Sequence, residues 1–531
     1  MSTLIRQSPG CVDLLVDRHV RSGHGERIAL VENGSLGRRT LTYQQLQAVT
    51  IELAHELDIS LAGSLVQRRI GLVGSATLET ICYWLAAMRC GHLPLLVHPD
   101  LPADQYPALW DGFDPDLVLH DRCASHPNGA TCQRIDTVLA TLALTPARSV
   151  SLPEVSAFSS GFDLRPALVL ATSGSTGHPK LCVHAHRSFW EFERTVTRKM
   201  WGIGRDDVVL GSGGPYFSFG LQAVHVPLSV GATAVLLPEW REHAEFLDTI
   251  EQERVTTFLA VPTLYHLLMA RARRTYDLSR LALSLAAGER LPDIIRQRWE
   301  AYSGSRMLDS IGTTETFAPY LSESRDGERL LGRVDGFDYV ESVRPADLDG
   351  AAPAGAAGPA LTFALSKGCM MLGYLVGGSS AALDPIDTPF LTADLFEPLG
   401  GGFRFLSRDS ERVKVAGQWV SPQQLEECLL ADSRVERAAA VPITTPEGLV
   451  RLRAYIVLVD SGAAGDEVAA SLMRRIQLEL KPRALRPDRI DVVQHIPSTP
   501  SGKLKRQDLL EQIPAIESPK VRAGIMLVNA G

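Results

Sequence analysis

At 531 residues the chain is long enough for two or more domains, each with a sizeable core. Hydrophobic residues make up 45% of it, as in ordinary globular proteins, and 61 acidic against 53 basic residues give a net charge of -8. This charge favours solubility and argues against nucleic acid as a partner.

The first residues show neither a signal-peptide nor a transit-peptide pattern. The apolar stretch over 81–97 is interrupted by Arg89 and His92, so it does not have the composition of a membrane span. We therefore expect a soluble, cytoplasmic protein that does not enter a membrane. The eight cysteines form no Cys-x-x-Cys pair, which favours buried thiols over a disulfide framework or a zinc site.

Short apolar runs alternate with longer amphipathic runs from about residue 28 onward. Residues 70–74 predict a strand that is followed by a helix over 78–90, and residues 167–171 predict another buried strand. Further strands are expected at 233–237 and 257–261, and further helices at 242–253 and 262–273. This alternation predicts mostly parallel sheets with helices on their faces, in two doubly wound layers.

The small-residue segment GAAPAGAAGP at 350–359 predicts a surface loop or a link between subdomains. After Ser407 the character changes to charged turns, a short strand at 413–415, an acidic helix at 422–430 and a basic tail. We therefore place the domain boundary near 407–412 and expect one domain over 1–407 and another over 408–531.

A loop rich in glycine and hydroxyl residues follows the strand expected at 167–171. Such a loop offers many hydroxyls and backbone N–H groups to a polyphosphate. It is not a Walker A loop, because His178 and Pro179 stand before the lysine. The alternative is a flexible turn, but the buried strand before the loop and the lysine after it favour phosphate binding. The residues concerned are Thr172, Ser173, Gly174, Ser175, Thr176, Gly177 and Lys180.

The segment TSGSTGHPK at 172–180 resembles the phosphate loop of the adenylate-forming superfamily, which includes acyl- and aryl-CoA ligases, peptide-synthetase adenylation domains and firefly luciferase. Leu181 departs from the family's usual glycine. The likeness extends over about 28–511. It implies an α/β fold, with a large N-terminal domain of two doubly wound sheet subdomains plus a β-barrel-like subdomain, and a small mobile α+β C-terminal domain. It also implies ATP, Mg²⁺ and coenzyme A as cofactors.

The segment SIGTTE at 310–315 is similar to the family's Tyr-Gly-x-Thr-Glu motif. The resemblance implies that Glu315 ligates Mg²⁺ and that Thr314 lies near the α-phosphate. Read without the other motifs, a capping turn at the start of a helix would be preferred. The residues that the resemblance places around the nucleotide here are Gly288, Glu289, Ser310, Ile311, Gly312 and Thr313.

The segment LTAD at 391–394 is similar to the family's Thr-Gly-Asp, which implies that Asp394 binds the ribose hydroxyls. The segment RDSERVKVAG at 408–417 resembles Gly-Arg-x-Asp-Asp-x-Ile-Lys-x-x-Gly. Arg408 would then contact ribose or phosphate, and Asp409 and Ser410 would form the hinge. Ser410 stands where the family's hinge aspartate is usual, and Ser407 replaces a glycine.

The segment PSTPSGKLKR at 497–506 is close to the family's terminal Pro-x-Thr-x-x-Gly-Lys-x-x-Arg. The resemblance implies that Lys503 is the adenylation lysine and acts together with Thr314 and Glu315. The segment GQWVSP at 417–422 is similar to benzoate-type CoA ligases and implies a thiolation role for Lys414, Gly417 and Trp419.

The segment GPYFSFGL at 214–221 resembles the substrate motif of benzoate-CoA ligases, where aromatic residues and glycine would shape a flat slot for one ring. Ala318 stands where benzoate-type members often have histidine, so it would leave space beside the ring. We therefore expect an ortho-substituted benzoate, such as 2-aminobenzoate (anthranilate) or 2-hydroxybenzoate (salicylate). The expected aryl-acid pocket comprises Phe217, Ser218, Phe219, Gly220, Ala287, Gly312, Ala318 and Pro319.

Other interpretations stay open. The chain could be an aryl-acid adenylase that loads the phosphopantetheine of a separate carrier protein, or a degenerate acyl or nucleotide binding protein. The departures at Leu181, Ser407 and Ser410 favour the latter, whereas the retained Lys503 argues against it. His184 and His186 are expected to be structural rather than metal ligands, and Cys182 to be a core residue. Relatives are commonly homodimers, but nothing in the spacing shows one.

Overall fold

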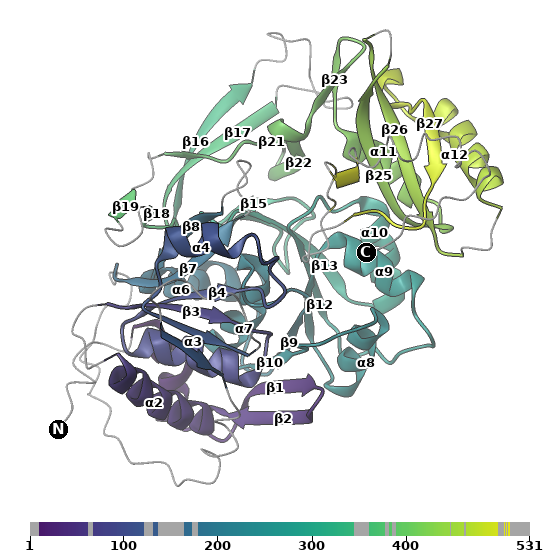
Figure 1. The fold of residues 1–531 in the computed structure, drawn as a ribbon. Helices are drawn as coiled ribbons and strands as arrows, with labels where there is room; N and C mark the ends of the chain where they lie inside the picture. Colours follow the sequence, from purple (N-terminus) through teal and green to yellow (C-terminus); the bar gives the residue numbers. More distant parts are fainter. Residues whose placement is uncertain are drawn as a thin grey trace.

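The structure is a computed structural model that describes residues 10–61, 67–121, 131–135, 164–172, 179–344, 360–376, 382–384, 389–445, 448–460, 464–497, 504, 506, 508 and 509. A large body formed by the N-terminal part of the chain carries a smaller C-terminal domain on one side (Figure 1). The segments 173–177 and 350–359 and the residue Lys503, singled out in the sequence, lie outside the described residues.

The first large sheet runs through the middle of the body in the order β15-β14-β13-β12-β11-β9-β10-β1-β2 (Figure 1). Its inner strands, from β13 to β1, are parallel, whereas β2, β14 and β15 at its edges are antiparallel to their neighbours. The strands are β1 Ile28–Gly34, β2 Gly37–Thr42, β9 Val208–Gly211, β10 Thr233–Leu236, β11 Thr257–Ala260, β12 Leu283–Ala287, β13 Arg306–Gly312, β14 Pro319–Ser322 and β15 Gly332–Arg333.

The second sheet has the order β19-β18-β8-β7-β4-β3-β5-β6, with a parallel part from β7 to β6 and an antiparallel part from β19 to β7. Its strands are β3 Arg69–Val73, β4 Leu93–Val97, β5 Leu117–His120, β6 Thr131–Arg134, β7 Pro166–Thr172, β8 Lys180–Ala185, β18 Gly373–Val376 and β19 Ala382–Asp384. These two sheets are the doubly wound layers that the alternation of apolar runs predicted.

A third, antiparallel sheet lies above them and leads into the C-terminal domain (Figure 1). It contains β16 Phe337–Arg344, β17 Ala360–Lys367, β20 Phe390–Leu391, β21 Asp394–Leu399 and β22 Gly402–Arg408. This sheet is the part of the N-terminal domain that was expected to be β-barrel-like.

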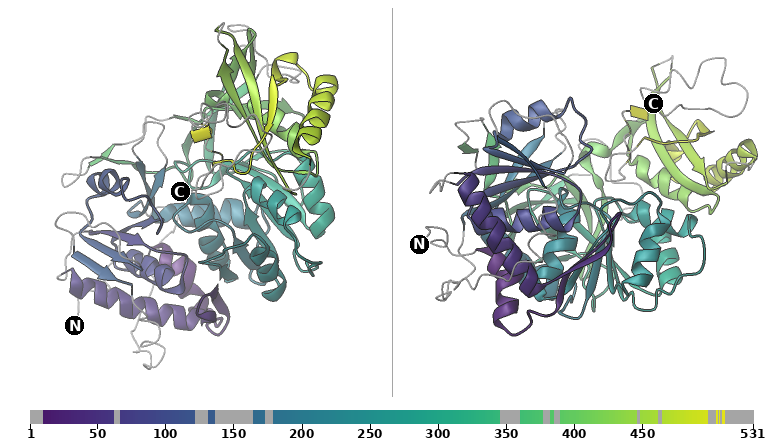
Figure 2. Two further views of the ribbon diagram at one scale, coloured as in Figure 1. Left: turned by 45° about the vertical axis from the view of Figure 1, so that its right-hand side comes forward. Right: turned by 60° about the horizontal axis from the view of Figure 1, so that its bottom comes forward.

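The C-terminal domain is α+β, as expected, and stands over the edge of the first sheet (Figure 2). A hairpin of β23 Val413–Val415 and β24 Gln418–Val420 precedes a sheet of β25 Val435–Thr444, β26 Val450–Leu458 and β27 Arg489–Val492. The helices α11 Pro422–Leu430 and α12 Gly465–Glu479 cover this sheet and form its core with Leu425, Leu472 and Ile476.

The helices of the N-terminal domain cover the faces of the large sheets. One of them, α7, is buried on all sides and packs in the core common to both sheets, as its continuous apolar sequence requires. The helices are α1 Arg18–Arg21, α2 Tyr43–Ser60, α3 Leu78–Arg89, α4 Tyr106–Phe113, α6 His186–Phe192, α7 Ser218–Val230, α8 Ala244–Gln252, α9 Pro262–Ala270 and α10 Asp293–Ser303.

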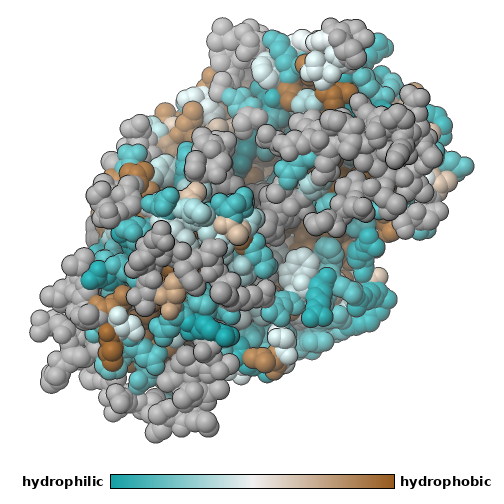
Figure 3. Space-filling view, viewed as in Figure 1, coloured by the Kyte–Doolittle hydropathy of each residue, from teal (hydrophilic) through white to brown (hydrophobic). Residues whose placement is uncertain are grey.

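The surface and the cysteines agree with the composition. Hydrophilic residues cover most of the coloured face in Figure 3, with scattered hydrophobic residues between them. Within the described part of the chain, no helix is long and apolar enough to span a membrane. Cys11, Cys82, Cys182 and Cys369 are buried free thiols.

Candidate active site

A cavity of about 230 Å³ lies between the N-terminal and C-terminal domains, and we call it the inter-domain cavity. Several residues of the sequence motifs line it together, although they are far apart in the chain. They are Gly288, Glu289, Ser310, Ile311, Gly312, Asp394 and Arg408. The C-terminal domain contributes residues that include Glu426, Leu504 and Arg506.

The parallel strands of the first sheet explain part of this convergence. The strands β12 and β13 are neighbours and end at the same edge, so Gly288 and Glu289 come to lie beside Ser310 to Gly312. The carboxyl edge of a parallel sheet is a usual place for a ligand site. A turn at Gly288 requires a φ of +83°, which favours glycine there. The Glu289 carboxylate accepts hydrogen bonds from the backbone N–H and hydroxyl of Thr263, at 3.1 and 2.7 Å.

Asp394 is the first residue of β21 and is only 1% exposed. Its Oδ1 accepts a hydrogen bond from Arg408 Nε at 3.1 Å, across the β21–β22 pair in which the two residues are opposite each other. Its Oδ2 accepts a hydrogen bond from the Tyr320 hydroxyl at 2.5 Å. Burial raises the pKa of the Asp394 carboxyl, whereas Arg408 and the Tyr320 hydroxyl act to lower it.

Glu315 lies in a turn after β13 that Thr316 stabilises through its contact with Thr313. The backbone carbonyl of Glu315 accepts the Met371 N–H at 2.8 Å, and Glu315 Oε1 accepts a hydrogen bond from the Tyr374 hydroxyl at 2.9 Å. Burial, followed by the acidic neighbour Glu315, raises the pKa of the Tyr374 phenol, so its hydroxyl stays a donor. Thr313 and Thr314 are half-buried in the same turn.

The glycine-rich loop connects β7 to β8 in the sequence. Thr172 and Lys180 are opposite each other at the end of this hairpin, and the segment 173–177 between them lies outside the described residues. Lys180 Nζ lies 5.3 Å from the centre of the Tyr374 ring, whose hydroxyl binds Glu315. Tyr374 therefore connects the base of the loop to the Glu315 turn, and no sequence motif had pointed to it.

A second cavity, of about 600 Å³, lies at the start of α7, and we call it the α7 cavity. Phe217 and Gly220 of the expected aryl-acid pocket line it, together with residues that include His98, Tyr216 and Trp240. Gly220 is required by packing, because a Cβ there would lie 2.1 Å from the carbonyl oxygen of Gly214.

The remaining residues of the expected aryl-acid pocket are placed differently. Ser218 and Phe219 are half-buried at the start of α7, and neither lines the two cavities described above. Ala287, Ala318 and Pro319 are buried, with Ala318 only 1% exposed. Ala318 and Pro319 contact Gly312, since a Cβ on Gly312 would lie 3.0 Å from the Pro319 Cα.

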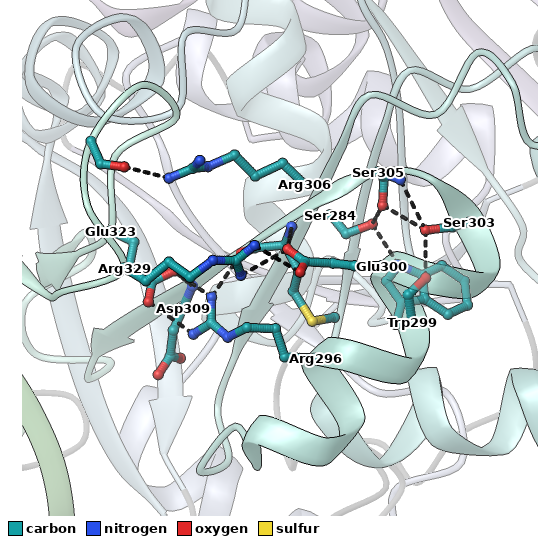
Figure 4. A network of polar contacts seen from close by, with 12 residues as sticks. Ser284, Arg296, Trp299, Glu300, Ser303, Ser305, Arg306, Asp309, Glu323 and Arg329 are labelled. Carbon is teal, nitrogen blue, oxygen red and sulfur yellow. Dashed lines mark hydrogen bonds and ion pairs between the residues drawn. The ribbon is translucent and has the colours of Figure 1, made fainter.

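A polar network supports β13 from the side of α10 (Figure 4). Arg296 donates to both carboxylate oxygens of Glu323, at 2.6 and 2.8 Å, and Glu323 Oε2 accepts the backbone N–H of Asp309 at 3.1 Å. Burial, followed by the nearby Glu323, raises the pKa of Asp309 to about 7. Asp309 directly precedes Ser310, so this network holds the strand that ends at the inter-domain cavity.

The C-terminal domain meets α9 and α10 through polar contacts. His266 lies 3.0 Å from the Val435 carbonyl oxygen, and Arg290 Nε lies 2.9 Å from Glu427 Oε1. Arg298 donates to the carbonyls of Leu430 and Ala431, at 3.1 and 2.6 Å. Arg271 forms an ion pair with Glu436.

This arrangement brings residues 504 and 506, rather than the β23–β24 hairpin, to the inter-domain cavity. Leu504 and Arg506, which flank Lys503 in the sequence, line the cavity. The expected thiolation residues do not: Lys414 and Gly417 are exposed on the hairpin, and Trp419 is half-buried there. The expected hinge residues Asp409 and Ser410 lie in a short 3₁₀ turn, Asp409–Glu411, where the Asp409 N–H donates to the Ala393 carbonyl at 3.0 Å.

The two histidines near the loop are buried in the protein core. His184 is fully buried, and burial lowers its pKa to about 3. His186 Nδ1 accepts the Cys11 N–H at 3.1 Å. Among the residues that the structure describes, no group of three or more His, Cys, Asp or Glu side chains is arranged to hold a metal ion.

Comparison with known proteins places the chain in a family. The model of the AMP-binding enzymes matches residues 16–343, and that of the AMP-binding enzyme C-terminal domain matches residues 424–503. A 4-hydroxybenzoate–CoA/benzoate–CoA ligase of Rhodopseudomonas palustris is 30% identical over 96% of this chain and 94% of its own length. A benzoate–CoA ligase of Thauera aromatica is 32% identical over 64% of each chain.

Solved structures share the fold. An anthranilate CoA ligase in complex with anthranoyl-AMP superimposes with a TM-score of 0.79 at 20% identity, covering 95% of this chain and 98% of its own. A benzoate CoA ligase from Burkholderia xenovorans LB400 superimposes with a TM-score of 0.76 at 23% identity, covering 95% of this chain and 100% of its own. The expected two-domain α/β architecture is thereby confirmed, as is the expectation of an ATP-dependent, AMP-forming ligase. The chain belongs to the AMP-binding enzyme family.

Proposed function

We propose that the protein is an aryl-CoA ligase that activates a benzoate-type acid as its aryl-AMP and transfers the acyl group to coenzyme A. The observation that carries this proposal is the inter-domain cavity, where segments that resemble the family's nucleotide motifs line one space. The benzoate and hydroxybenzoate CoA ligases among the relatives support the choice of an aryl acid.

The reaction consists of two displacements. First, a carboxylate oxygen of the acid attacks the α-phosphorus of ATP, so that the aryl-AMP forms and pyrophosphate leaves. Then the sulfur of CoA attacks the acyl carbon, AMP leaves with the bonding electrons, and the thiol proton passes to solvent. The first step brings negative groups together, so it depends on cations and on donors that are already in place.

The residues have assigned roles in this scheme. Asp394 accepts the ribose hydroxyls, Arg408 contacts the ribose or phosphate, and Lys503 bridges the acid carboxylate and the α-phosphate. Glu315 suits Mg²⁺, because hard cations prefer carboxylate oxygens and no basic side chain pairs with it within the described part of the chain. When bound, Mg²⁺ neutralises phosphate charge. Thr172, Lys180 and the loop between them bind the β- and γ-phosphates.

We assign an ortho-substituted benzoate as the acid. The backbone carbonyl of Ala318 lies beside Gly312, and Gly312 lines the inter-domain cavity. Ala318 itself is buried and lines neither cavity, so we propose that its small side chain leaves room behind Gly312 when the acid binds. An ortho amino or hydroxyl group lies beside the carboxylate on the ring, so we propose 2-aminobenzoate or 2-hydroxybenzoate.

The test is AMP release from ATP with benzoate, its 2-amino, 2-hydroxy, 3-hydroxy and 4-hydroxy derivatives, cinnamate and short fatty acids, each with and without CoA. We expect CoA-dependent turnover that is highest with an ortho-substituted benzoate and an aryl-CoA product by mass spectrometry. An adenylate that CoA fails to discharge would point to a carrier protein as the acceptor. No adenylate with any acid would overturn the proposal.

Substitution of Lys503 tests the first displacement, the formation of aryl-AMP, separately from the second. Lys503→Ala should slow aryl-AMP formation by about a hundred- to a thousandfold, as loss of a catalytic donor does. The same variant should still convert chemically supplied aryl-AMP to aryl-CoA. If both partial reactions fall equally, Lys503 does not have the assigned role.

A further inference from the structure

Tyr320 connects the first sheet to the third at the inter-domain cavity. It lies on β14, is fully buried, and donates its hydroxyl hydrogen to Asp394 Oδ2 at 2.5 Å. Its ring packs edge to face on Phe396 of β21, at 6.3 Å between ring centres. The backbone carbonyl of Tyr320 accepts the Val334 N–H at 3.0 Å. The ring and backbone are therefore fixed on several sides, and the hydroxyl lies against the Asp394 carboxylate and the Thr392 side chain.

The Asp394 carboxylate has a limited set of positions for hydrogen bonds. An ionised carboxylate offers about four acceptor sites. Tyr320 occupies one site on Oδ2, and Arg408 Nε occupies one on Oδ1 at 3.1 Å. About two sites remain, which is the number that two adjacent hydroxyl donors require. Asp394 is 1% exposed but lines the inter-domain cavity, so the open sites can only be reached from that side.

We propose that Tyr320 is a positioning residue for nucleotide binding, whose hydroxyl holds the Asp394 carboxylate in the orientation that accepts the 2′- and 3′-hydroxyls of ATP. The inference rests on the proposed ribose role of Asp394. It adds a residue that lies outside every sequence motif and that does not itself contact the nucleotide.

Loss of the Tyr320 hydroxyl changes the hydrogen bonding of the Asp394 carboxylate without changing the shape of the core. In Tyr320→Phe, Oδ2 keeps its buried position but has lost its donor, which is costly for a charged acceptor. The carboxylate then rotates toward Arg408 or takes up a proton, and a protonated carboxyl donates where the ribose needs an acceptor. Binding that depends on the ribose hydroxyls should therefore weaken, whereas binding through the phosphates and the base should not.

The experiment compares the dissociation constants of ATP, 2′-deoxy-ATP and 3′-deoxy-ATP by calorimetry, with Mg²⁺ but without acid or CoA. We expect the wild-type protein to bind ATP about tenfold to a hundredfold more tightly than each deoxy analogue, the range of a hydrogen bond to a charged group. Tyr320→Phe should weaken the binding of ATP by about tenfold and the binding of the deoxy analogues much less. The ratio of the dissociation constant of each deoxy analogue to that of ATP should therefore come close to one. In an Asp394→Asn background the same substitution should have no further effect.

Tyr43→Phe is the matched control. Tyr43 is also fully buried, and its hydroxyl donates to the Ala232 carbonyl at 2.6 Å, away from both cavities. This variant should lower the melting temperature as Tyr320→Phe does, but it should keep the wild-type ratio between ATP and the deoxy analogues.

The possible failures can be told apart. If the wild type prefers ATP but Tyr320→Phe keeps the same ratio, the hydroxyl does not position Asp394 and the inference is wrong. If the wild type does not distinguish ATP from its deoxy analogues, the ribose role of Asp394 fails and the inference fails with it. The panel of acids would in that case still decide whether the protein is a ligase.

Discussion

Arg506 donates hydrogen bonds to both carboxylate oxygens of Glu426, at 2.9 and 2.8 Å. Glu426 Oε1 also accepts the backbone N–H of Ala440 at 2.9 Å, so the pair joins Arg506 to α11 and β25. Both side chains line the inter-domain cavity. The pair therefore holds Arg506, which lies three residues after the proposed catalytic lysine in the sequence.

Breaking this pair should impair the first partial reaction selectively. Glu426→Gln removes the charge that holds Arg506, three residues after Lys503, so aryl-AMP formation should fall by about tenfold to a hundredfold. The use of supplied aryl-AMP with CoA should change by less than about twofold. Rapid-quench measurement of each partial reaction gives the comparison.

The control is another buried ion pair of the same domain. Arg453 Nε lies 2.7 Å from Asp491 Oδ2, and neither residue lines the inter-domain cavity. Asp491→Asn should lower the melting temperature but leave the ratio of the partial reactions unchanged. Equal slowing of aryl-AMP formation in both variants would mean that loss of stability, not position, explains the effect of Glu426→Gln.

Ala318→His should shift the preference among acids. The larger imidazole would take up the room that we propose for the ortho group behind Gly312, so the ratio of kcat/KM for 2-aminobenzoate to that for benzoate should fall by about tenfold or more. Ala318→Val should give an intermediate ratio. An unchanged ratio in a folded Ala318→His protein would remove the argument for an ortho substituent.

Gly220→Ala should damage the start of α7. The added Cβ would lie 2.1 Å from the Gly214 carbonyl oxygen, and relief of this overlap requires movement of the backbone that lines the α7 cavity. We expect a loss of about 1 to 3 kcal/mol in the free energy of unfolding and a raised KM for the acid. Gly204→Ala is the control, because a Cβ there meets no atom within 4 Å. Wild-type behaviour of Gly220→Ala would contradict the packing described.

Asp309 should make the stability of the protein depend on pH. Its carboxyl has an ordinary pKa of 3.8, which rises to about 7 in the folded protein, chiefly through burial and then through Glu323. The folded state therefore binds the proton more tightly than the unfolded state. The stabilising contribution is fully present below about pH 3.8 and is lost as the pH rises through about 7.

The corresponding variant is Asp309→Asn, which cannot ionise. Its free energy of unfolding, relative to that of the wild type, should increase between pH 5 and pH 8 by up to about 1.4 kcal/mol for each unit. Denaturant titrations at several pH values measure this difference. A constant difference over the range would show that Asp309 does not titrate there.

The alternation of apolar runs predicted the large sheets well, because the spacing of apolar residues in each run is that of the strand or helix it forms. The strand expected at 70–74 is Arg69–Val73, and the helix expected at 78–90 is Leu78–Arg89. The helix expected at 262–273 ends earlier, at Ala270, and Arg271, the residue that follows it, forms an ion pair with Glu436 of the C-terminal domain. A contact with another domain leaves no trace in local periodicity.

In the candidate site, too, local sequence patterns revealed some residues, whereas contacts between distant parts of the chain stayed hidden. The motif residues Ser310, Asp394 and Arg408 could be identified because each lies in a short contiguous pattern, and the structure places them around one cavity. Their supporting partners could not be identified. Tyr320 is 74 residues from Asp394, and Tyr374 is 59 residues from Glu315, so only the packing of whole sheets brings them together.

The contact between the domains is made largely by basic side chains. His266, Arg271, Arg290 and Arg298 approach carbonyl and carboxylate oxygens of the C-terminal domain, and the apolar Leu430 packs against the core around α9 and α10. Water can replace hydrogen bonds of this kind at modest net cost, unlike the removal of apolar side chains from a core. Ionic strength therefore becomes a means of control: added salt screens the Arg271–Glu436 and Arg290–Glu427 ion pairs and loosens the C-terminal domain, while the hydrophobic cores of the two domains stay intact.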